Sequence, residues 1–246
     1  MLSRSNKKSK NNNNSKRQLI THTEPKSPIS EQYRTIRTNL SYSSVDKKMQ
    51  VILITSADPS AGKSTTAANI AVAYSQSGNR TLLIDGDMRK PTVHHTFELP
   101  NQQGLSNAIV NDEMSVYSMI HESMIPSLYV LTAGPVPPNP SELIASQKME
   151  HMIEELRTEF DTIIIDTPPV LAVTDATVFS NYTDGTLMVV NAQDNNRNSI
   201  NKAKNNLEKA NANILGIIMN NVKNKASDDY YYYCLLYTSP SPRDRG

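Results

Sequence analysis

The chain alternates between short apolar runs and longer amphipathic stretches over most of its length. The apolar runs are rich in β-branched and aliphatic residues, are bounded by polar or turn residues, and are typical of buried strands. They lie at 50–56, 81–87, 127–133, 161–167, 185–191 and 213–221. The stretches between several of them have helical spacing or small residues, at 63–78, 141–160, 173–182 and 196–212. We therefore predict strands that alternate with helices.

This alternation indicates the fold class. Strands that are apolar on both faces and separated by helices predict a mostly parallel sheet with helices on both faces. A further helix is predicted from Pro28 to about Leu40, capped by Ser27, because the first helical position tolerates proline. We expect 92–126 to be partly helical and the proline-rich stretch 133–142 to be a loop beside the active site. The sequence predicts one three-layer α/β/α domain.

Both ends of the chain differ from this pattern. Residues 1–18 contain six basic residues, no acidic residue and a run of asparagines, so they lack the apolar surface needed to order themselves. We expect 1–21 to be a disordered, solvated basic arm. The alternative is that this arm is weakly attracted to an anionic membrane face. Residues 22–226 would form the domain and 227–233 a tyrosine-rich tail. Residues 234–246 continue no earlier pattern, as a foreign extension would.

Composition narrows the functional classes. The formal net charge is +1, which argues against a globally basic nucleic-acid-binding protein, and no nucleic-acid partner is expected. No run of about 18 apolar residues is present, so no membrane span is predicted. The single cysteine, Cys234, excludes an intramolecular disulfide and suits a reducing cytoplasm. The five histidines have no metal-ligand spacing. These properties predict a cytoplasmic location.

The stretch "ADPSAGKS" at 57–64 predicts a phosphate-binding loop. It matches G-x-x-x-x-G-K-[ST] except that Ala57 replaces the first glycine, and a strand precedes it and a helix follows it. In such a loop backbone N–H groups surround the β-phosphate, Lys63 bridges the β- and γ-phosphates, and Ser64 coordinates Mg²⁺. ATP and Mg²⁺ are therefore the expected cofactors. The expected nucleotide-binding residues are Asp58, Pro59, Ser60, Ala61, Gly62, Lys63, Ser64 and Thr65.

Three carboxylates follow two of the predicted strands. Asp85 and Asp87 lie in "LLIDGDMR", and Asp166 ends the apolar run of "TIIIDTPP". Open α/β sheets bind ligands at the carboxyl ends of their strands. A carboxylate after so apolar a run is costly to bury unless it faces a cation, directly or through water. Together with the loop, the three carboxylates predict a MgATP site. They also predict that the α/β/α domain is of the P-loop NTPase type.

These motifs resemble a particular family, the bacterial tyrosine kinases of capsule and exopolysaccharide systems. "ADPSAGKS" is similar to its Walker A motif, "LLIDGDMR" to its Walker A′ motif and "TIIIDTPP" to its Walker B motif. "EQYRTIR" matches its E-x-x-R-x-x-R oligomerisation motif, and a tyrosine cluster follows the last predicted strand. The resemblance covers about residues 22–233. It implies an ATP-dependent protein-tyrosine kinase.

The resemblance also implies roles for individual residues. Lys63 would contact the phosphates, while Ser64, Asp85 and Asp166 would hold Mg²⁺. Asp85 or Asp87 would accept the proton of the incoming tyrosine hydroxyl, and of the two we favour Asp85. Arg89 and Lys90 either add positive charge near the transferred group or are solvated residues at a strand end. Asn220 and Asn221, after the last strand, are candidate adenine contacts.

Two further motifs concern assembly and self-modification. Glu31, Arg34 and Arg37 recur every three residues and share one helix face, which suits either local ion pairs or a subunit contact. The resemblance implies that they close a homo-oligomeric ring, an octamer in this family, in which one chain phosphorylates its neighbour. Full phosphorylation of the tail would add roughly six to eight negative charges, which we expect to dissociate the ring. The predicted autophosphorylation sites are Tyr230, Tyr231, Tyr232 and Tyr233.

By resemblance, the expected partner is a separate transmembrane activator that recruits the kinase to the inner face of the membrane. Sugar-nucleotide dehydrogenases and glycosyltransferases of polysaccharide synthesis are the expected substrates. Two alternatives compete with this hypothesis. One is a partitioning ATPase of the ParA or MinD type, which would carry a second signature lysine where this chain has Asp58. The other is a nucleotide-gated assembly subunit of a polysaccharide export complex, which the substitution Lys63→Met would distinguish if export failed while the ring persisted.

Overall fold

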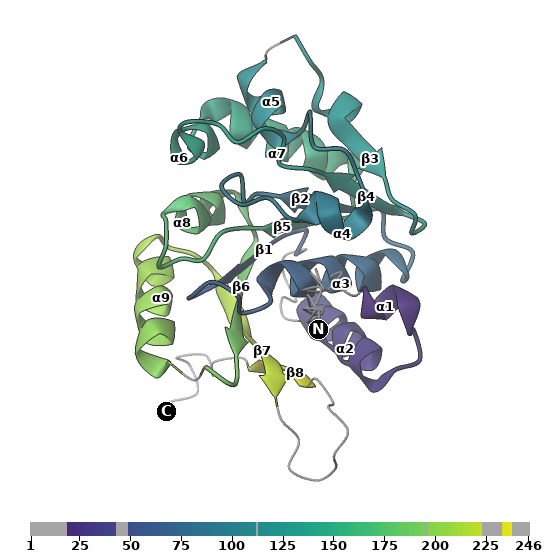
Figure 1. Ribbon diagram of the computed structural model, residues 1–246, viewed down its shortest axis with the longest axis vertical. Helices are drawn as coiled ribbons and strands as arrows, with labels where there is room; N and C mark the ends of the chain where they lie inside the picture. The colour runs from purple at the N-terminus through teal and green to yellow at the C-terminus, as the bar shows by residue number, and fades with distance from the viewer. Residues whose placement is uncertain (1–18, 43–48, 112, 195, 223–232, 238–246) are drawn as a thin grey trace, which may run out of the picture.

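The computed structural model describes residues 19–42, 49–111, 113–194 and 196–222, together with the backbone of 233–237 (Figure 1). Residues 1–18 of the predicted basic arm, the predicted phosphorylation sites Tyr230 to Tyr232, and 238–246 of the extension lie outside the described residues. Within the described part, no helix is both long enough and apolar enough to cross a membrane.

One eight-stranded sheet forms the centre of the described structure, in the order β3-β4-β2-β5-β1-β6-β7-β8. The six strands from β4 to β7 are parallel, and β3 and β8 pair antiparallel at the two edges. This confirms the predicted mostly parallel sheet. The strands are β1 (Val51–Ser56), β2 (Thr81–Asp85), β3 (Ile120–Glu122), β4 (Leu128–Leu131), β5 (Thr162–Asp166), β6 (Gly185–Asn191), β7 (Ile214–Val222) and β8 (Tyr233–Tyr237).

Helices cover both faces of this sheet (Figure 1). One face packs against α1 (Ile20–Thr23), α2 (Pro28–Tyr42), α3 (Lys63–Ser75) and α4 (Val93–Phe97), and the other packs against α5 (Leu105–Val110), α6 (Pro140–Ile144), α7 (Gln147–Glu159), α8 (Asp175–Phe179) and α9 (Arg197–Lys209). Strand β1 shows why a continuous apolar run is needed, because Ile52 and Ile54 enter the first core while Val51 and Leu53 enter the second. The predicted three-layer arrangement is confirmed.

Local signals explain several element boundaries. The amide of Ser30 donates to Ser27 Oγ at 3.2 Å, which confirms Ser27 as the cap of α2. The stretch 141–160, predicted as one helix, is divided into α6 and α7. Ser146 makes this break because its hydroxyl accepts from the amide of Met149 and so caps a new helix. The helix predicted at 173–182 is α8 followed by a 3₁₀ turn, Ser180–Tyr182.

Two parts of the structure extend beyond the predicted boundaries. Leu19 is buried against the first core and α1 begins at Ile20, so the packed body includes residues assigned to the arm. At the other end, β8 runs from Tyr233 across the predicted start of the extension at residue 234 and pairs with β7. In the segment 92–126, the helices α4 and α5 agree with the partly helical prediction, whereas the edge strand β3 was not predicted.

Candidate functional site

The carboxyl ends of β1, β2 and β5 meet at one edge of the sheet. Parallel pairing places Asp85 directly beside Asp166, and β5 also pairs with β1, which leads into the loop at 57–62. Helix α3 begins at Lys63, immediately after Gly62, which has a φ of 91°. That left-handed conformation favours glycine. A loop, a helix N-terminus and strand-end carboxylates thus converge as the sequence predicts.

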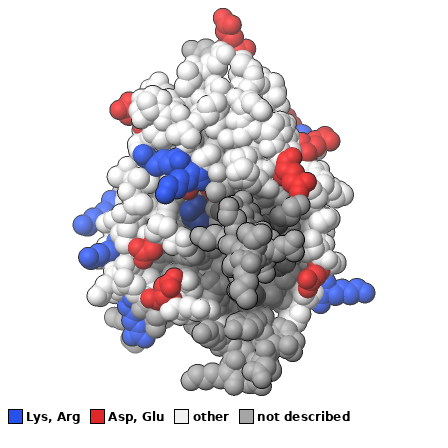
Figure 2. All heavy atoms as spheres, in the orientation of Figure 1, with Lys and Arg blue, Asp and Glu red and all other residues white. Residues whose placement is uncertain are grey.

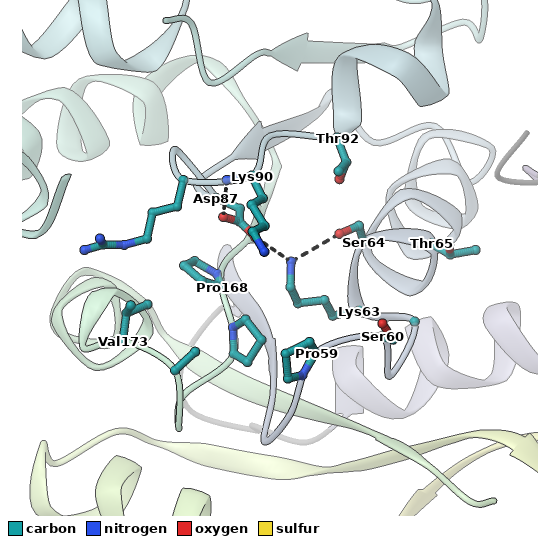
Figure 3. A pocket seen from close by; sticks show the side chains of 14 residues that line it. Pro59, Ser60, Lys63, Ser64, Thr65, Asp87, Lys90, Thr92, Pro168 and Val173 are labelled. Carbon is teal, nitrogen blue, oxygen red and sulfur yellow. Dashed lines mark hydrogen bonds and ion pairs between the residues drawn. The ribbon is translucent and has the colours of Figure 1, made fainter. Parts of the chain in front are cut away.

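A cleft of about 660 Å³ lies at this edge. Figure 3 shows the ammonium of Lys63 inside it, between Ser64 of α3 and Asp87 of the loop after β2. Six of the eight predicted nucleotide-binding residues line the cleft. They are Pro59, Ser60, Gly62, Lys63, Ser64 and Thr65, joined by Asp87, Arg89, Lys90, Thr92, Pro168, Pro169, Ala172 and Val173.

Lys63 is the centre of the charge network in the cleft. Its Nζ lies 3.1 Å from Asp87 Oδ2, 3.3 Å from Asp166 Oδ1 and 3.2 Å from Ser64 Oγ. Burial alone would lower the pKa of Lys63, but the charges of Asp166, Asp87 and Asp85 outweigh it and the pKa is raised. The ammonium therefore stays protonated where phosphate oxygens would lie.

The two Walker A′ carboxylates have different surroundings. Asp85 is fully buried, and its oxygens accept from the amides of Asp87, Thr92 and Val93 at 3.3, 3.0 and 2.9 Å. Burial and then the charge of Asp166 raise the pKa of Asp85 to about 7, although the amides of Val93 and Thr92 act in the opposite direction. Asp87 instead lines the cleft, where its second oxygen accepts from the amide of Lys90 at 3.0 Å. Only Asp87 of this pair faces the open space.

Asp166 is fully buried, and burial raises its pKa even though the Lys63 ammonium lowers it. Its Oδ2 has no hydrogen-bond partner among the described residues. A buried carboxylate oxygen without a partner is costly unless a cation or water satisfies it. No three His, Cys, Asp or Glu side chains of the described part are placed to hold a metal by themselves. The oxygen donors Ser64, Asp87 and Asp166 nevertheless fit Mg²⁺, which commonly shares its ligands with nucleotide phosphates.

The remaining predicted contacts lie to one side of the cleft. Asp58 and Ala61 line a smaller crevice together with Asn191 at the end of β6. Asn220 donates to the carbonyl of Ala61 at 3.2 Å. Asn221 donates to Asn191 Oδ1 at 3.3 Å. The structure therefore places Asn220 against the loop and Asn221 against the end of β6.

The other predicted residues lie away from the cleft. Arg34 pairs with Glu31 of its own helix and donates to the Pro25 carbonyl, and Arg37 donates to the Ala73 carbonyl of α3 at 3.0 Å. The proline-rich stretch 133–142 does not line the cleft, and its Ser141, which lies in α6, accepts a hydrogen bond from Arg89. Figure 2 shows a cluster of Lys and Arg side chains on one face, with Asp and Glu side chains scattered around it.

Sequence reasoning missed part of the site. Thr92, Pro168, Pro169, Ala172 and Val173 line the cleft, although only "TPP" carried a motif signal. Asp175 binds Arg89 but lies nine residues after Asp166 in a stretch with no distinguishing pattern. Its role depends on how α8 returns to the sheet edge. No local signal in the sequence identifies it.

Comparison with known proteins gives consistent results. A family model described as "ParA: NUBPL iron-transfer P-loop NTPase" matches residues 47–230. The chain is 48% identical over 216 residues to "Putative tyrosine-protein kinase CapB" of Staphylococcus aureus, covering 87% of this chain and 94% of that protein. It is 46% identical over 217 residues to "Tyrosine-protein kinase YwqD" of Bacillus subtilis (strain 168), covering 88% and 91%. The crystal structure of "the chimerical protein CapA2B2" superposes with a TM-score of 0.81 at 47% identity, covering 84% and 90%.

Proposed function

The chain belongs to the bacterial tyrosine-protein kinases within the ParA-type P-loop NTPases, and from that premise we propose how its own residues perform the transfer. The γ-phosphate of ATP passes to tyrosine hydroxyls, including those of Tyr230 to Tyr233 of a neighbouring copy. One observation carries the proposal. The largely buried ammonium of Lys63 lies within 3.3 Å of two carboxylates and beside Ser64, at the mouth of a phosphate-binding loop.

The donor side of the site fits a nucleoside triphosphate. Residues of the loop and of the first turn of α3 line the cleft, and phosphate binds well at such a loop and helix N-terminus. Lys63 would exchange its carboxylate partners for phosphate oxygens. Ser64, Asp87 and Asp166 would hold Mg²⁺, directly or through water, and Asp87 replaces Asp85 in this set because both oxygens of Asp85 are bonded to backbone amides. The ion neutralises charge on the phosphates.

The acceptor side favours a phenol. Pro168, Pro169, Ala172 and Val173 form an apolar wall of the cleft, and Figure 3 shows Pro168 and Val173 along one side with Asp87 and Lys90 above them. Such a surface packs well against an aromatic ring. A tyrosine hydroxyl has a pKa of about 10 and attacks in its neutral form. The new bond joins the phenolic oxygen to the γ-phosphorus, the bond to the leaving ADP oxygen breaks, and Asp87 accepts the proton.

This assignment differs from the preference for Asp85 stated from the sequence. Asp85 is fully buried behind the loop and does not line the cleft, whereas Asp87 does. A proton acceptor must come within hydrogen-bonding reach of the substrate hydroxyl. Asp85 is better suited to holding the start of α4, since it accepts from the amides of Thr92 and Val93.

The biological setting is proposed from the family. A separate transmembrane activator would dock on this kinase and bring it to the inner face of the membrane. Enzymes of capsule or exopolysaccharide synthesis, such as sugar-nucleotide dehydrogenases and glycosyltransferases, would be its other substrates. The helix face bearing Glu31, Arg34 and Arg37 would form the contact between neighbouring copies in a ring.

The test uses the full-length chain and labelled ATP. We expect phosphotyrosine to appear in the tail. Because transfer occurs between copies, the initial rate per chain should rise with protein concentration until the ring is fully assembled. A mixture of a Lys63→Met chain with a chain whose four tail tyrosines are Phe should label only the Lys63→Met chain. Consumption of ATP without any phosphotyrosine, at every protein concentration, would overturn the proposal.

A further inference from the structure

Arg89 follows Asp87 by two residues, and its guanidinium is tied to a different part of the chain. Its Nε donates to Asp175 Oδ2 at 2.8 Å, and its Nη2 donates to Asp175 Oδ1 at 3.0 Å. The same Nη2 donates to Ser141 Oγ at 2.9 Å, and that hydroxyl donates to Asp175 Oδ1 at 2.7 Å. Three segments that are distant in the sequence therefore meet in one hydrogen-bonded cluster.

The burial of the two ion-pair partners shows which one is the anchor. The side chain of Asp175 is 0% exposed, whereas that of Arg89 is 37% exposed. A buried carboxylate is tolerated only when it is paired, and a bidentate guanidinium is the strongest such partner. The hydrogen bond to Asp175, and after it the charge of Asp175, raises the pKa of Arg89. Asp175 lies in the first turn of α8, whose Ala176 and Phe179 are in the core, so its position is fixed.

The cluster joins the two sides of the acceptor region. On one side, Asp87 belongs to the same turn as Arg89, because its Oδ1 accepts from the amide of Lys90 at 3.0 Å. On the other side, the apolar wall from Pro168 to Val173 leads directly into α8 and Asp175. The separation between the Asp87 carboxylate and the apolar wall thus depends on the Arg89–Asp175 pair.

We propose that Asp175 and Ser141 are positioning residues which, through Arg89, set the width of the slot in which the acceptor tyrosine ring lies. The inference rests on the proposed tyrosine transfer and deepens it. Neither Asp175 nor Ser141 lines the cleft, and Arg89 directs its guanidinium to these two residues. Loss of the cluster should therefore affect the acceptor and leave ATP binding in place, because a displacement of about 1 Å at a reacting group costs roughly 100-fold in rate.

A second Arg–Asp pair in the chain provides a matched control. Arg157 Nη1 and Nη2 donate to Asp184 Oδ2 and Oδ1 at 2.9 and 3.0 Å, which is the same bidentate chemistry. Asp184 also accepts from the amides of Gln50 and Val51, before and at the first residue of β1. This pair therefore lies at the opposite end of the parallel strands from the cleft.

The experiment compares Asp175→Asn and Asp184→Asn in the full-length chain. Measured quantities are kcat and KM for a tyrosine peptide that copies 226–233, ATP affinity, and the thermal midpoint. We expect Asp175→Asn to lower kcat/KM for the peptide roughly 10- to 100-fold while ATP affinity stays within about two-fold. Asp184→Asn should lower the thermal midpoint and leave kcat/KM of the folded protein within about two-fold.

A double variant guards against simple unfolding. Replacement of a buried ion pair by apolar residues is often neutral for stability, so Arg89→Met with Asp175→Leu should fold and still lose the acceptor step. If the double variant folds and transfers phosphate as well as the wild type, the inference is wrong. It is also wrong if ATP affinity falls in parallel with kcat/KM. A wild-type chain that binds ATP but never phosphorylates the peptide or its own tail overturns the proposed function and this inference together.

Discussion

Asp85 and Asp166 are direct neighbours across the β2–β5 ladder, and both end their strands fully buried. Two carboxylates so close together cannot both ionise without cost. Burial and the charge of Asp166 raise the pKa of Asp85 from 3.8 to about 7. The nucleotide-free protein is therefore poised to hold a proton at its active site near neutral pH.

This pair predicts how stability depends on pH. Between pH 3.8 and about 7 the native protein keeps a proton on Asp85 that the unfolded chain has released. The contribution of Asp85 to the free energy of unfolding is therefore complete below pH 3.8 and is lost as the pH rises through about 7. The free energy of unfolding should fall by at most about 1.4 kcal/mol per pH unit in this range. Urea unfolding without nucleotide should show a smaller slope in Asp85→Asn. The exposed carboxylate variant Glu113→Gln should keep the wild-type slope, and a wild-type slope in Asp85→Asn would contradict the prediction.

Lys63→Met should abolish phosphate transfer and also destabilise the nucleotide-free protein. Removal of the ammonium leaves Asp87 and Asp166 without their common cation, and breaking a buried pair costs about 3 kcal/mol. The loss should be smaller at low pH, where Asp166, whose pKa burial raises, can protonate. Urea denaturation at about pH 6 and about pH 8 measures it. Lys202→Met, which removes an exposed cation of α9, is the control, and equal losses in the two variants would refute the explanation.

Asp87→Asn should separate ATP binding from phosphate transfer. Asp87 is the carboxylate that lines the cleft, and loss of a positioned base lowers a rate by about 10²- to 10⁴-fold. Single-turnover transfer and binding of a fluorescent ATP analogue measure the two steps. We expect transfer to fall by at least about 100-fold, whereas ATP affinity should fall much less because Ser64 and Asp166 remain to hold the ion. Rapid transfer by Asp87→Asn together with no transfer by Asp85→Asn would return the proton-acceptor role to Asp85.

Gly62→Ala should damage the phosphate-binding loop for two separate reasons. Its φ of 91° is strained for any residue with a Cβ, and a Cβ there would lie 2.1 Å from Asn220 Nδ2. Asn220→Ala removes the second problem but not the first. Thermal unfolding and ATP affinity should therefore be worst in Gly62→Ala and partly restored in the double variant. No restoration would mean that Asn220 does not limit the loop.

Arg34 and Arg37 should differ in their effect on stability even if both are needed for assembly. Arg37 donates to the Ala73 carbonyl near the end of α3, so Arg37→Ala should cost about 1–2 kcal/mol in any assembly state. Arg34 pairs with Glu31 and donates to the Pro25 carbonyl, but both contacts are exposed, so Arg34→Ala should cost less than Arg37→Ala, about 0.5 kcal/mol. Sedimentation velocity measures assembly separately, and an intact ring in Arg34→Ala would remove this residue from the proposed subunit contact.

The fold was predictable because its signals are local. A run such as "TIIIDTPP" specifies a doubly covered strand by itself, and the strand–loop–helix order around Gly62 specifies the phosphate loop. Predictions failed where a single polar residue changed the path of the chain, or where an element is too short to give a pattern. Ser146 divides a helix that its apolar periodicity would continue, and the three-residue strand β3 is too short to give a pattern.

The sequence by itself determined the layered sheet, the phosphate loop and which residues carry charge near it. Only the tertiary structure decided that Asp87 faces the cleft while Asp85 is bonded to backbone amides behind it. The sequence cannot distinguish them, because both are aspartates of the same short motif. Only the tertiary structure joined Arg89 to Asp175 across 86 positions. The physical reason is that local propensity acts over a few residues, whereas the pairing of buried charges depends on which strand ends and helices the completed sheet brings together.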